Sequence, residues 1–160
     1  MSKYVEKFFL SSQLPGYLFV LSNLCGINDR VWLQCPDSQR EFFSAMLVRI
    51  GLIVWPDAKA KNSERPRYAI SVCENWQDVE HCSRVDAGTT IAFLSSQKIS
   101  IADFEDRVSA FLPQHPNVIL VHEVSCGVMK KTFAVWASRD CGEFEQLKIN
   151  MLRHTLNEAI

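Results

Sequence analysis

The segment VILVHEVSCGVMKK, residues 118–131, gathers side chains that can do chemistry. Five of them fall within ten positions: His122, Glu123, Cys126, Lys130 and Lys131. An imidazole near a thiol could form a nucleophilic pair. The aliphatic start of the segment predicts a strand, however, and successive strand residues point to opposite faces of a sheet. His122 and Glu123 therefore cannot act together, and a hairpin with Gly127 in its loop is favoured over a catalytic site.

Two further clusters contain metal-ligand or nucleophile types. The Glu-His-Cys run at 80–82 holds adjacent donors, which rarely reach one metal ion without ligands from elsewhere in the chain. Asp140, Cys141 and Glu145 stand at an expected strand-to-helix junction, where a helix dipole could favour a thiolate. A turn with Asp140 as the helix cap is the favoured interpretation. Neither cluster predicts an active site.

The composition is that of an ordinary folded domain, with 160 residues, 48% of them hydrophobic, and a net charge of −1. The sequence has no glycine-rich phosphate loop, no nucleophile elbow and no His-Glu-x-x-His motif. The six cysteines include no Cys-x-x-Cys pair, and with no signal peptide they predict reduced thiols in the cytoplasm. The longest apolar runs are far shorter than the ~20 residues of a membrane span. We expect a non-catalytic cytoplasmic protein with no metal, cofactor or membrane contact.

Residues 37–51 carry the clearest helix pattern. Ser38 and Glu41 predict a capping box at its start, and Gly51 suits the left-handed position at its end. The short apolar runs around this helix are rich in branched and aromatic residues, which favours buried strands. Strands are expected at 31–35, 52–55 and 68–72.

The same order of elements recurs further along the chain. A helix capped by Ser100 lies 62 residues after the cap at Ser38 and is flanked by further apolar runs. These runs predict strands at 89–96, 118–124 and 131–137. We therefore predict an α+β fold in which duplicated βαββ modules form one sheet-based domain with terminal helices.

This organisation makes residues 1–160 a single domain. Its expected parts are an N-terminal helical extension at 1–29, a first βαββ module at 30–73, a connector at 74–88, a second module at 89–137 and a C-terminal helix at 138–160. A short helix is expected at 2–11. The segment 14–24 fits either a helix or a strand, and so does the connector.

The order of REFFSAMLVRIGLIVW, PRYAISV, DAGTTIAFLSS, ADFEDRVSAFL and TFAVWASRDCGEFE resembles the glyoxalase and bleomycin-resistance superfamily, also called vicinal oxygen chelate proteins, over residues 30–148. The resemblance implies paired βαβββ modules. In metal-dependent members it would place ligands near Trp32, Glu80, Thr90 and Glu145. Because tryptophan and threonine are not ligands of that type, it implies binding of small molecules without a metal.

Three functions follow from these patterns. The first is a non-catalytic binding or adaptor module, in which the C-terminal helix engages a protein partner or a second copy through Phe144, Leu147, Met151 and Leu152. The second is a small-molecule-binding protein or enzyme of the glyoxalase type. The third is an anion or nucleic-acid binder whose basic loops share one rim of the duplicated fold. The candidate anion-binding residues are Lys59, Lys61, Arg65, Arg67, Lys130 and Lys131.

Overall fold

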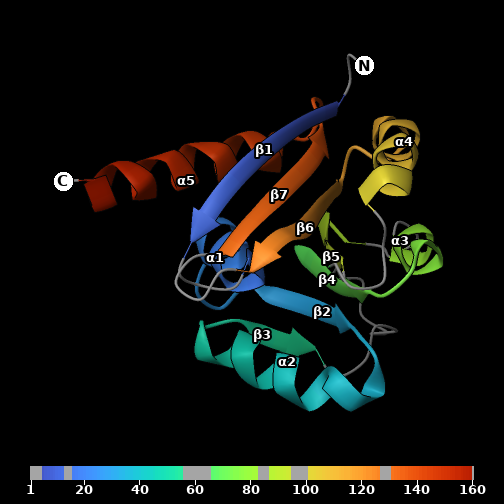
Figure 1. The fold of residues 1–160 in the computed structure, drawn as a ribbon. Coiled ribbons are helices and arrows are strands. Elements are labelled where there is room, and N and C mark those ends of the chain that lie inside the picture. Colours follow the sequence, from blue (N-terminus) through green and yellow to red (C-terminus); the bar gives the residue numbers. More distant parts are fainter. Residues whose placement is uncertain are drawn as a thin grey trace.

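One seven-stranded sheet organises the protein in a computed structural model (Figure 1), which describes residues 5–12, 16–55, 66–82, 87–94, 101–126 and 131–159. The strand order is β1-β7-β6-β5-β4-β2-β3. β3, β2, β4, β5 and β6 pair in parallel, whereas β7 runs antiparallel to both of its neighbours, β6 and β1. The strands are β1 (Val5–Ser12), β2 (Arg30–Gln34), β3 (Ile53–Trp55), β4 (Tyr68–Cys73), β5 (Thr89–Leu94), β6 (Val118–Cys126) and β7 (Lys131–Ser138).

Helices cover both faces of the sheet. They are α1 (Gly16–Leu24), α2 (Asp37–Arg49), α3 (Trp76–Cys82), α4 (Ile101–Phe111) and α5 (Gly142–Ala159), with a short 3-10 turn at Leu112–Gln114. α1, α2 and α5 bury apolar residues in the core on one face, and α3 and α4 do so on the other (Figure 1). None of the helices in the described ranges combines the length and the apolar character of a membrane span.

The direction of the crossovers explains which helix covers which face. A connection between parallel strands is almost always right-handed, so reversing the direction of travel along the sheet moves the connecting helix to the other face. The chain moves one way from β1 through α1 to β2 and through α2 to β3, and the opposite way from β4 through α3, β5 and α4 to β6. α1 and α2 therefore share one face, and α3 and α4 share the other.

The central strands are buried on both faces, as their near-continuous apolar sequences require. Along β4, Tyr68 and Ile70 face the core under α1, α2 and α5, whereas Cys73 faces the core under α3 and α4. β5 is buried at every position. Its residues Ile91 and Ala92 likewise contribute to opposite cores. This two-sided burial is the mark of a parallel α/β sheet.

The structure confirms several predicted elements. The helix expected at 37–51 is α2, and Gly51 adopts a φ of +93° as its end requires. The predicted capping box is wrong, because Pro36 occupies the N-cap position and no side-chain hydrogen bond caps this helix. The six strands that the apolar runs predicted correspond to β2 to β7. The C-terminal helix is α5.

The predicted α+β duplication is wrong, and so is the glyoxalase-type pairing of modules. α2 and α4, the two helices taken as equivalent, lie on opposite faces of one sheet. The strands that follow them also differ, since β4 pairs in parallel with its neighbours while β7 is antiparallel to both of its own. Successive strand–helix units of an α/β fold have the same order of elements without being copies of one another. Their sequence pattern therefore resembles a repeat. The fold is α/β with a mostly parallel sheet.

The N-terminal segment differs from the prediction as well. The helix expected at 2–11 is β1, which pairs with β7 through an eight-residue register from Val5 opposite Ser138 to Ser12 opposite Lys131. The backbone groups of β1 are satisfied by hydrogen bonds to β7, which is distant in sequence. A local sequence pattern cannot predict such a pairing. The ambiguous segment 14–24 contains helix α1, and the ambiguous connector contains helix α3.

Helix α5 uses its apolar face to hold the protein's own core together. Phe144, Leu147 and Met151 are at most 1% exposed and pack in the core that α1 shares, whereas Leu152 is 52% exposed. Of the four residues predicted to bind a partner, only Leu152 lies at the surface.

We predict that Leu147→Ala lowers the free energy of unfolding by about 2–5 kcal/mol, because it leaves a cavity in a packed core. The matched control Leu152→Ala, five residues further along the same helix, should change it by less than about 0.5 kcal/mol. Urea unfolding followed by circular dichroism measures both. Equal losses from the two variants would contradict the placement of this helix.

Candidate functional site

The point where the crossovers change direction lies between β2 and β4. These adjacent parallel strands send their connections to opposite faces, α2 from β2 and α3 from β4. In open α/β sheets such a point leaves a crevice outside the carboxyl ends of the strands, which is where ligands bind. A cavity of about 310 Å³ occurs here. Its lining consists of Gln34, Cys35, Pro36, Ser71, Val72, Cys73, Asp78 and His81. We call it the switch-point cavity.

The floor of the switch-point cavity is a side-chain contact between the two strands. Gln34 and Ser71 are register partners in the parallel ladder. The Ser71 hydroxyl donates a hydrogen bond to Oε1 of Gln34 at 3.2 Å. Because Ser71 is only 3% exposed, this bond satisfies a polar group that the sheet would otherwise bury alone. It also holds the two strand ends together where their connections diverge.

Helix α3 forms the wall, and two hydrogen bonds from backbone amides to side chains fix its first turn. Oδ1 of Asn75 accepts a hydrogen bond from the Asp78 amide at 2.9 Å. Oδ2 of Asp78 in turn accepts one from the Glu74 amide, also at 2.9 Å. His81 follows Asp78 by three positions, so the two side chains share a face of the helix. Since His81 is exposed, its imidazole is available to a ligand.

The thiols of the cavity are neutral at physiological pH. Burial is the largest of the effects that raise the pKa of Cys35, and the nearby Asp37 adds to it against the opposing charge of Arg40. The pKa of Cys73 is raised by a hydrogen bond to Cys82 and by burial. Because the thiolate is the reactive form, neither cysteine is an activated nucleophile. The cavity therefore presents hydrogen-bonding groups and not an assembled catalytic constellation.

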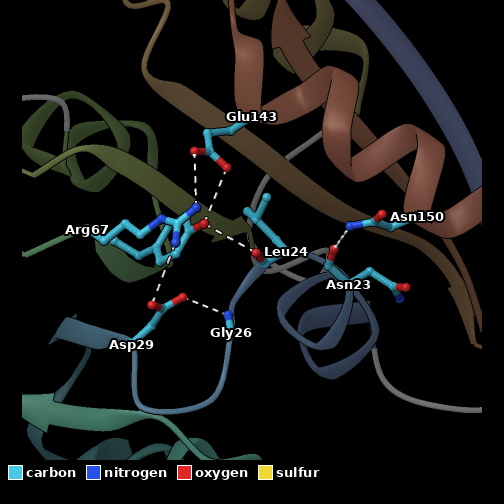
Figure 2. Close-up of polar contacts among 8 residues, drawn as sticks. Asn23, Leu24, Gly26, Asp29, Arg67, Glu143 and Asn150 are labelled. Atoms are coloured by element: carbon cyan, nitrogen blue, oxygen red, sulfur yellow. Dashed lines mark hydrogen bonds and ion pairs between the residues drawn. The ribbon is translucent and has the colours of Figure 1, made fainter.

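A second cavity, of about 450 Å³, lies at the opposite edge of the sheet, where the parallel strands begin. Its cation is Arg67, which lies 3.8 Å from an Asp29 oxygen and 3.9 Å from a Glu143 oxygen (Figure 2). The Arg67 side chain is 60% exposed, so these long ion pairs contribute little to stability. The positive charge of the guanidinium is nevertheless paired with the two carboxylates of Asp29 and Glu143. The lining comprises Arg67, Gly88, Thr89, Pro116, Asn117, Asp140, Cys141, Gly142 and Glu143.

Further hydrogen bonds at this amino edge join α1 to α5 and to β4. Nδ2 of Asn150 donates to the Asn23 carbonyl at 2.6 Å (Figure 2), and the Tyr68 hydroxyl lies 3.2 Å from the Leu24 carbonyl. Burial, with a smaller contribution from the Asp29 charge, raises the pKa of the Cys25 thiol to about 12. The polar groups at the amino edge bind other elements of the chain. The switch-point cavity is therefore the better ligand site.

The predicted basic residues do not form one rim. Arg67 precedes β4 at the amino edge of the sheet, whereas Lys131 opens β7 opposite Cys126, at the carboxyl end of β6. These two positions lie at opposite edges. The other four candidates lie outside the described residues: Lys59, Lys61, Arg65 and Lys130.

The metal-ligand types are also dispersed. Within the ranges that the structure describes, no group of three His, Cys, Asp or Glu side chains could hold a metal ion. His122 is 2% exposed on β6, and His81 lines the switch-point cavity from α3. Sequence reasoning missed this cavity, although Asn75 and Asp78 carry the spacing of a helix cap just after a predicted strand.

The comparisons with known proteins show the fold. No protein-family model matches the chain, and no curated protein matches its sequence. Solved structures do match. One is an aromatic-amino-acid aminotransferase from Burkholderia pseudomallei covalently bound to pyridoxal phosphate, with a TM-score of 0.54, 16% identity, and coverage of 91% of this chain and 46% of that one. Another is a PLP-bound, inferred aminotransferase from Clostridium difficile 630, with a TM-score of 0.53, 12% identity, and coverage of 92% and 46%.

At these identities the likeness shows the fold alone, and the chain spans less than half the length of either match. It overturns the expected adaptor module together with both alternatives, the glyoxalase-type binder and the nucleic-acid binder. The reasons are physical: three of the four expected partner-binding residues are core, the sheet does not consist of paired modules, and the described basic residues lie at opposite edges.

Pyridoxal phosphate is held in enzymes as a Schiff base with a lysine amine. The lining of the switch-point cavity includes no lysine among the residues that the structure describes. Lys98 and Lys130 lie outside those residues, as does the side chain of Lys131. The described residues of the cavity therefore do not fit this cofactor, although the sheet around it resembles part of the matched aminotransferase structures.

We predict that iodoacetamide alkylates Cys35 slowly at pH 7 and faster as the pH rises, with the increase continuing above the ordinary thiol pKa. The folded-state pKa is raised, so the protonated thiol persists to higher pH than in the unfolded chain. Mass spectrometry of the tryptic peptide 31–40, in which Cys35 is the one cysteine, measures the rate. The urea-unfolded protein is the control. A folded-state rate that levels off below the unfolded midpoint would contradict the burial of this thiol.

Proposed function

We propose that this protein is a small-ligand-binding domain of the α/β sheet type, with its site in the switch-point cavity. The observation that carries the proposal is the coincidence of a 310 Å³ hollow with the reversal of crossover direction between β2 and β4. Its volume falls within the usual range of small-molecule sites, roughly 300–1,000 Å³. Ligand binding is thus supported by topology and shape together.

The groups that line the cavity favour a ligand rich in hydrogen-bond donors. The Asp78 carboxylate uses one oxygen to accept from the Glu74 amide and retains further acceptor capacity. Gln34 and Ser71, which share one hydrogen bond, also line the cavity, and the raised pKa values of Cys35 and Cys73 keep these two thiols protonated. A small amine or amide matches this set, whereas a carboxylate would face the Asp78 charge.

The proposed role is binding, since the described lining has no activated nucleophile and no cofactor amine. His81 is the one imidazole of this lining, and it stands on an exposed face of α3. We assign it a ligand contact at the mouth of the cavity. Asp78 has the additional role of positioning α3, because its carboxylate belongs to the helix cap.

Fragment screening by ¹H–¹⁵N NMR tests the location of the site. A panel of small amines and amides should shift the amide signals of Gln34, Cys35, Ser71 and His81, and a matched panel of small carboxylates should shift them less. Shifts that cluster instead at Gly88, Asn117 and Gly142 would place the site at the amino edge and overturn the proposal.

We predict that His81→Ala weakens binding of the best amine fragment about tenfold, the loss of one good hydrogen bond to a polar group. Gln77→Ala is the matched control, because Gln77 is exposed on the same short helix and does not line the cavity. Titration by isothermal calorimetry compares the two dissociation constants. Equal affinities for both variants would remove His81 from the site.

Pyridoxal phosphate serves as a further probe. Borohydride reduction after incubation should leave no pyridoxyl group on the peptides that line the switch-point cavity, because their described residues include no lysine. Peptide mass spectrometry detects the adduct. A stoichiometric adduct on one lysine, with loss of fragment binding, would show that the cofactor occupies this site.

A further inference from the structure

Two buried thiols meet where α3 ends against β4. Cys73 is the last residue of β4 and Cys82 is the last residue of α3, and they are 0% and 1% exposed. Both are free thiols in the same apolar core. The Cys73 thiol is hydrogen-bonded to Cys82, whose own thiol donates to the Val79 carbonyl at 2.9 Å. The two thiols therefore lie in one apolar core, within hydrogen-bonding reach of each other.

The segment between these cysteines carries the wall of the switch-point cavity. Asp78 and His81 both lie between Cys73 and Cys82 in the sequence and both line the cavity. The wall is a helix of only seven residues. It is anchored at its start by the Asn75 and Asp78 cap and at its end by the contact between the thiols. A covalent bond at the second anchor would fix the wall at both ends.

We propose that Cys73 and Cys82 are an oxidisable pair that closes an intramolecular disulfide and locks the wall of the switch-point cavity. The oxidant is a low-molecular-weight disulfide of the glutathione type. One cysteine attacks its S–S bond, releasing one small thiol and leaving a mixed disulfide on the protein. The second cysteine then displaces the other small thiol. Two protein S–H bonds and one small-molecule S–S bond break, one protein S–S bond and two small S–H bonds form, and two electrons pass to the oxidant.

The contact geometry favours this pair over the other cysteines. A disulfide requires sulfurs about 2.05 Å apart and closely placed Cβ atoms, which neighbours in hydrogen-bond contact approach by side-chain rotation. The pair reacts slowly, because both sulfurs are buried, and the hydrogen bond to Cys82 together with burial raises the pKa of the Cys73 thiol. Reaction proceeds through transient opening of the short helix α3, so the pair responds to sustained oxidation.

The sequence around the pair makes the test direct. Trypsin releases residues 68–84 as one peptide that contains Cys73, Cys82 and no other cysteine. After the full-length protein is incubated with oxidised glutathione and free thiols are alkylated, this peptide should have lost two hydrogen atoms and carry no alkyl group. Cleavage after Glu74 and Glu80 should then leave its two cysteine fragments joined until a reductant is added.

Matched variants and a second measurement complete the test. Cys73→Ser should abolish the loss of two hydrogens, and Cys141→Ser, which removes a buried cysteine on the other side of the sheet, should retain it. In the oxidised protein, amide hydrogen exchange across 76–82 should slow about tenfold, since the disulfide suppresses local opening of the helix. Complete alkylation of both cysteines under conditions that oxidise Cys35 would overturn the proposal, as would glutathione adducts on Cys73 that never resolve. Neither readout requires a ligand.

Discussion

The right-handedness of parallel crossovers is the constraint on which this structure depends. It fixes the face that each connecting helix covers once the strand order is set. Because β2 and β4 are neighbours whose chains then travel in opposite directions, α2 and α3 must lie on opposite faces. The separation of these two helices opens the switch-point cavity, so the site is a consequence of connectivity before any side chain is considered.

The side chains at the two edges of the sheet have different roles. At the amino edge, Arg67 meets Asp29 and Glu143, and Asn150 binds the end of α1, so that polar groups join elements. At the carboxyl edge, Ser71 bonds to Gln34 and the cap of α3 fixes the wall, and all of these elements contribute residues to the lining of the cavity. The thiol contact between β4 and α3 places a redox-sensitive group beside that hollow.

The sequence predicted local elements well and their arrangement poorly. Helix α2 and strands β2 to β7 follow from periodicity and branched residues, which act over a few positions. β1 was misread as a helix because its partner β7 lies more than a hundred residues away, beyond any local pattern. The predicted duplication is wrong because the succession of elements along the chain does not determine the order of the strands in the sheet. The cavity was missed for the same reason, since Gln34 and Ser71 become neighbours only through the order of the sheet.

The most direct test of this account is the pairing of β2 with β4 in solution. Interstrand nuclear Overhauser effects should connect Leu33 with Ile70 and Gln34 with Ser71 in a parallel pattern, as the register requires. Such contacts would place the divergence of α2 and α3 between these strands. Contacts that pair β2 with β6 or β7 instead, or an antiparallel pattern between β2 and β4, would contradict the strand order and remove the switch-point cavity with it.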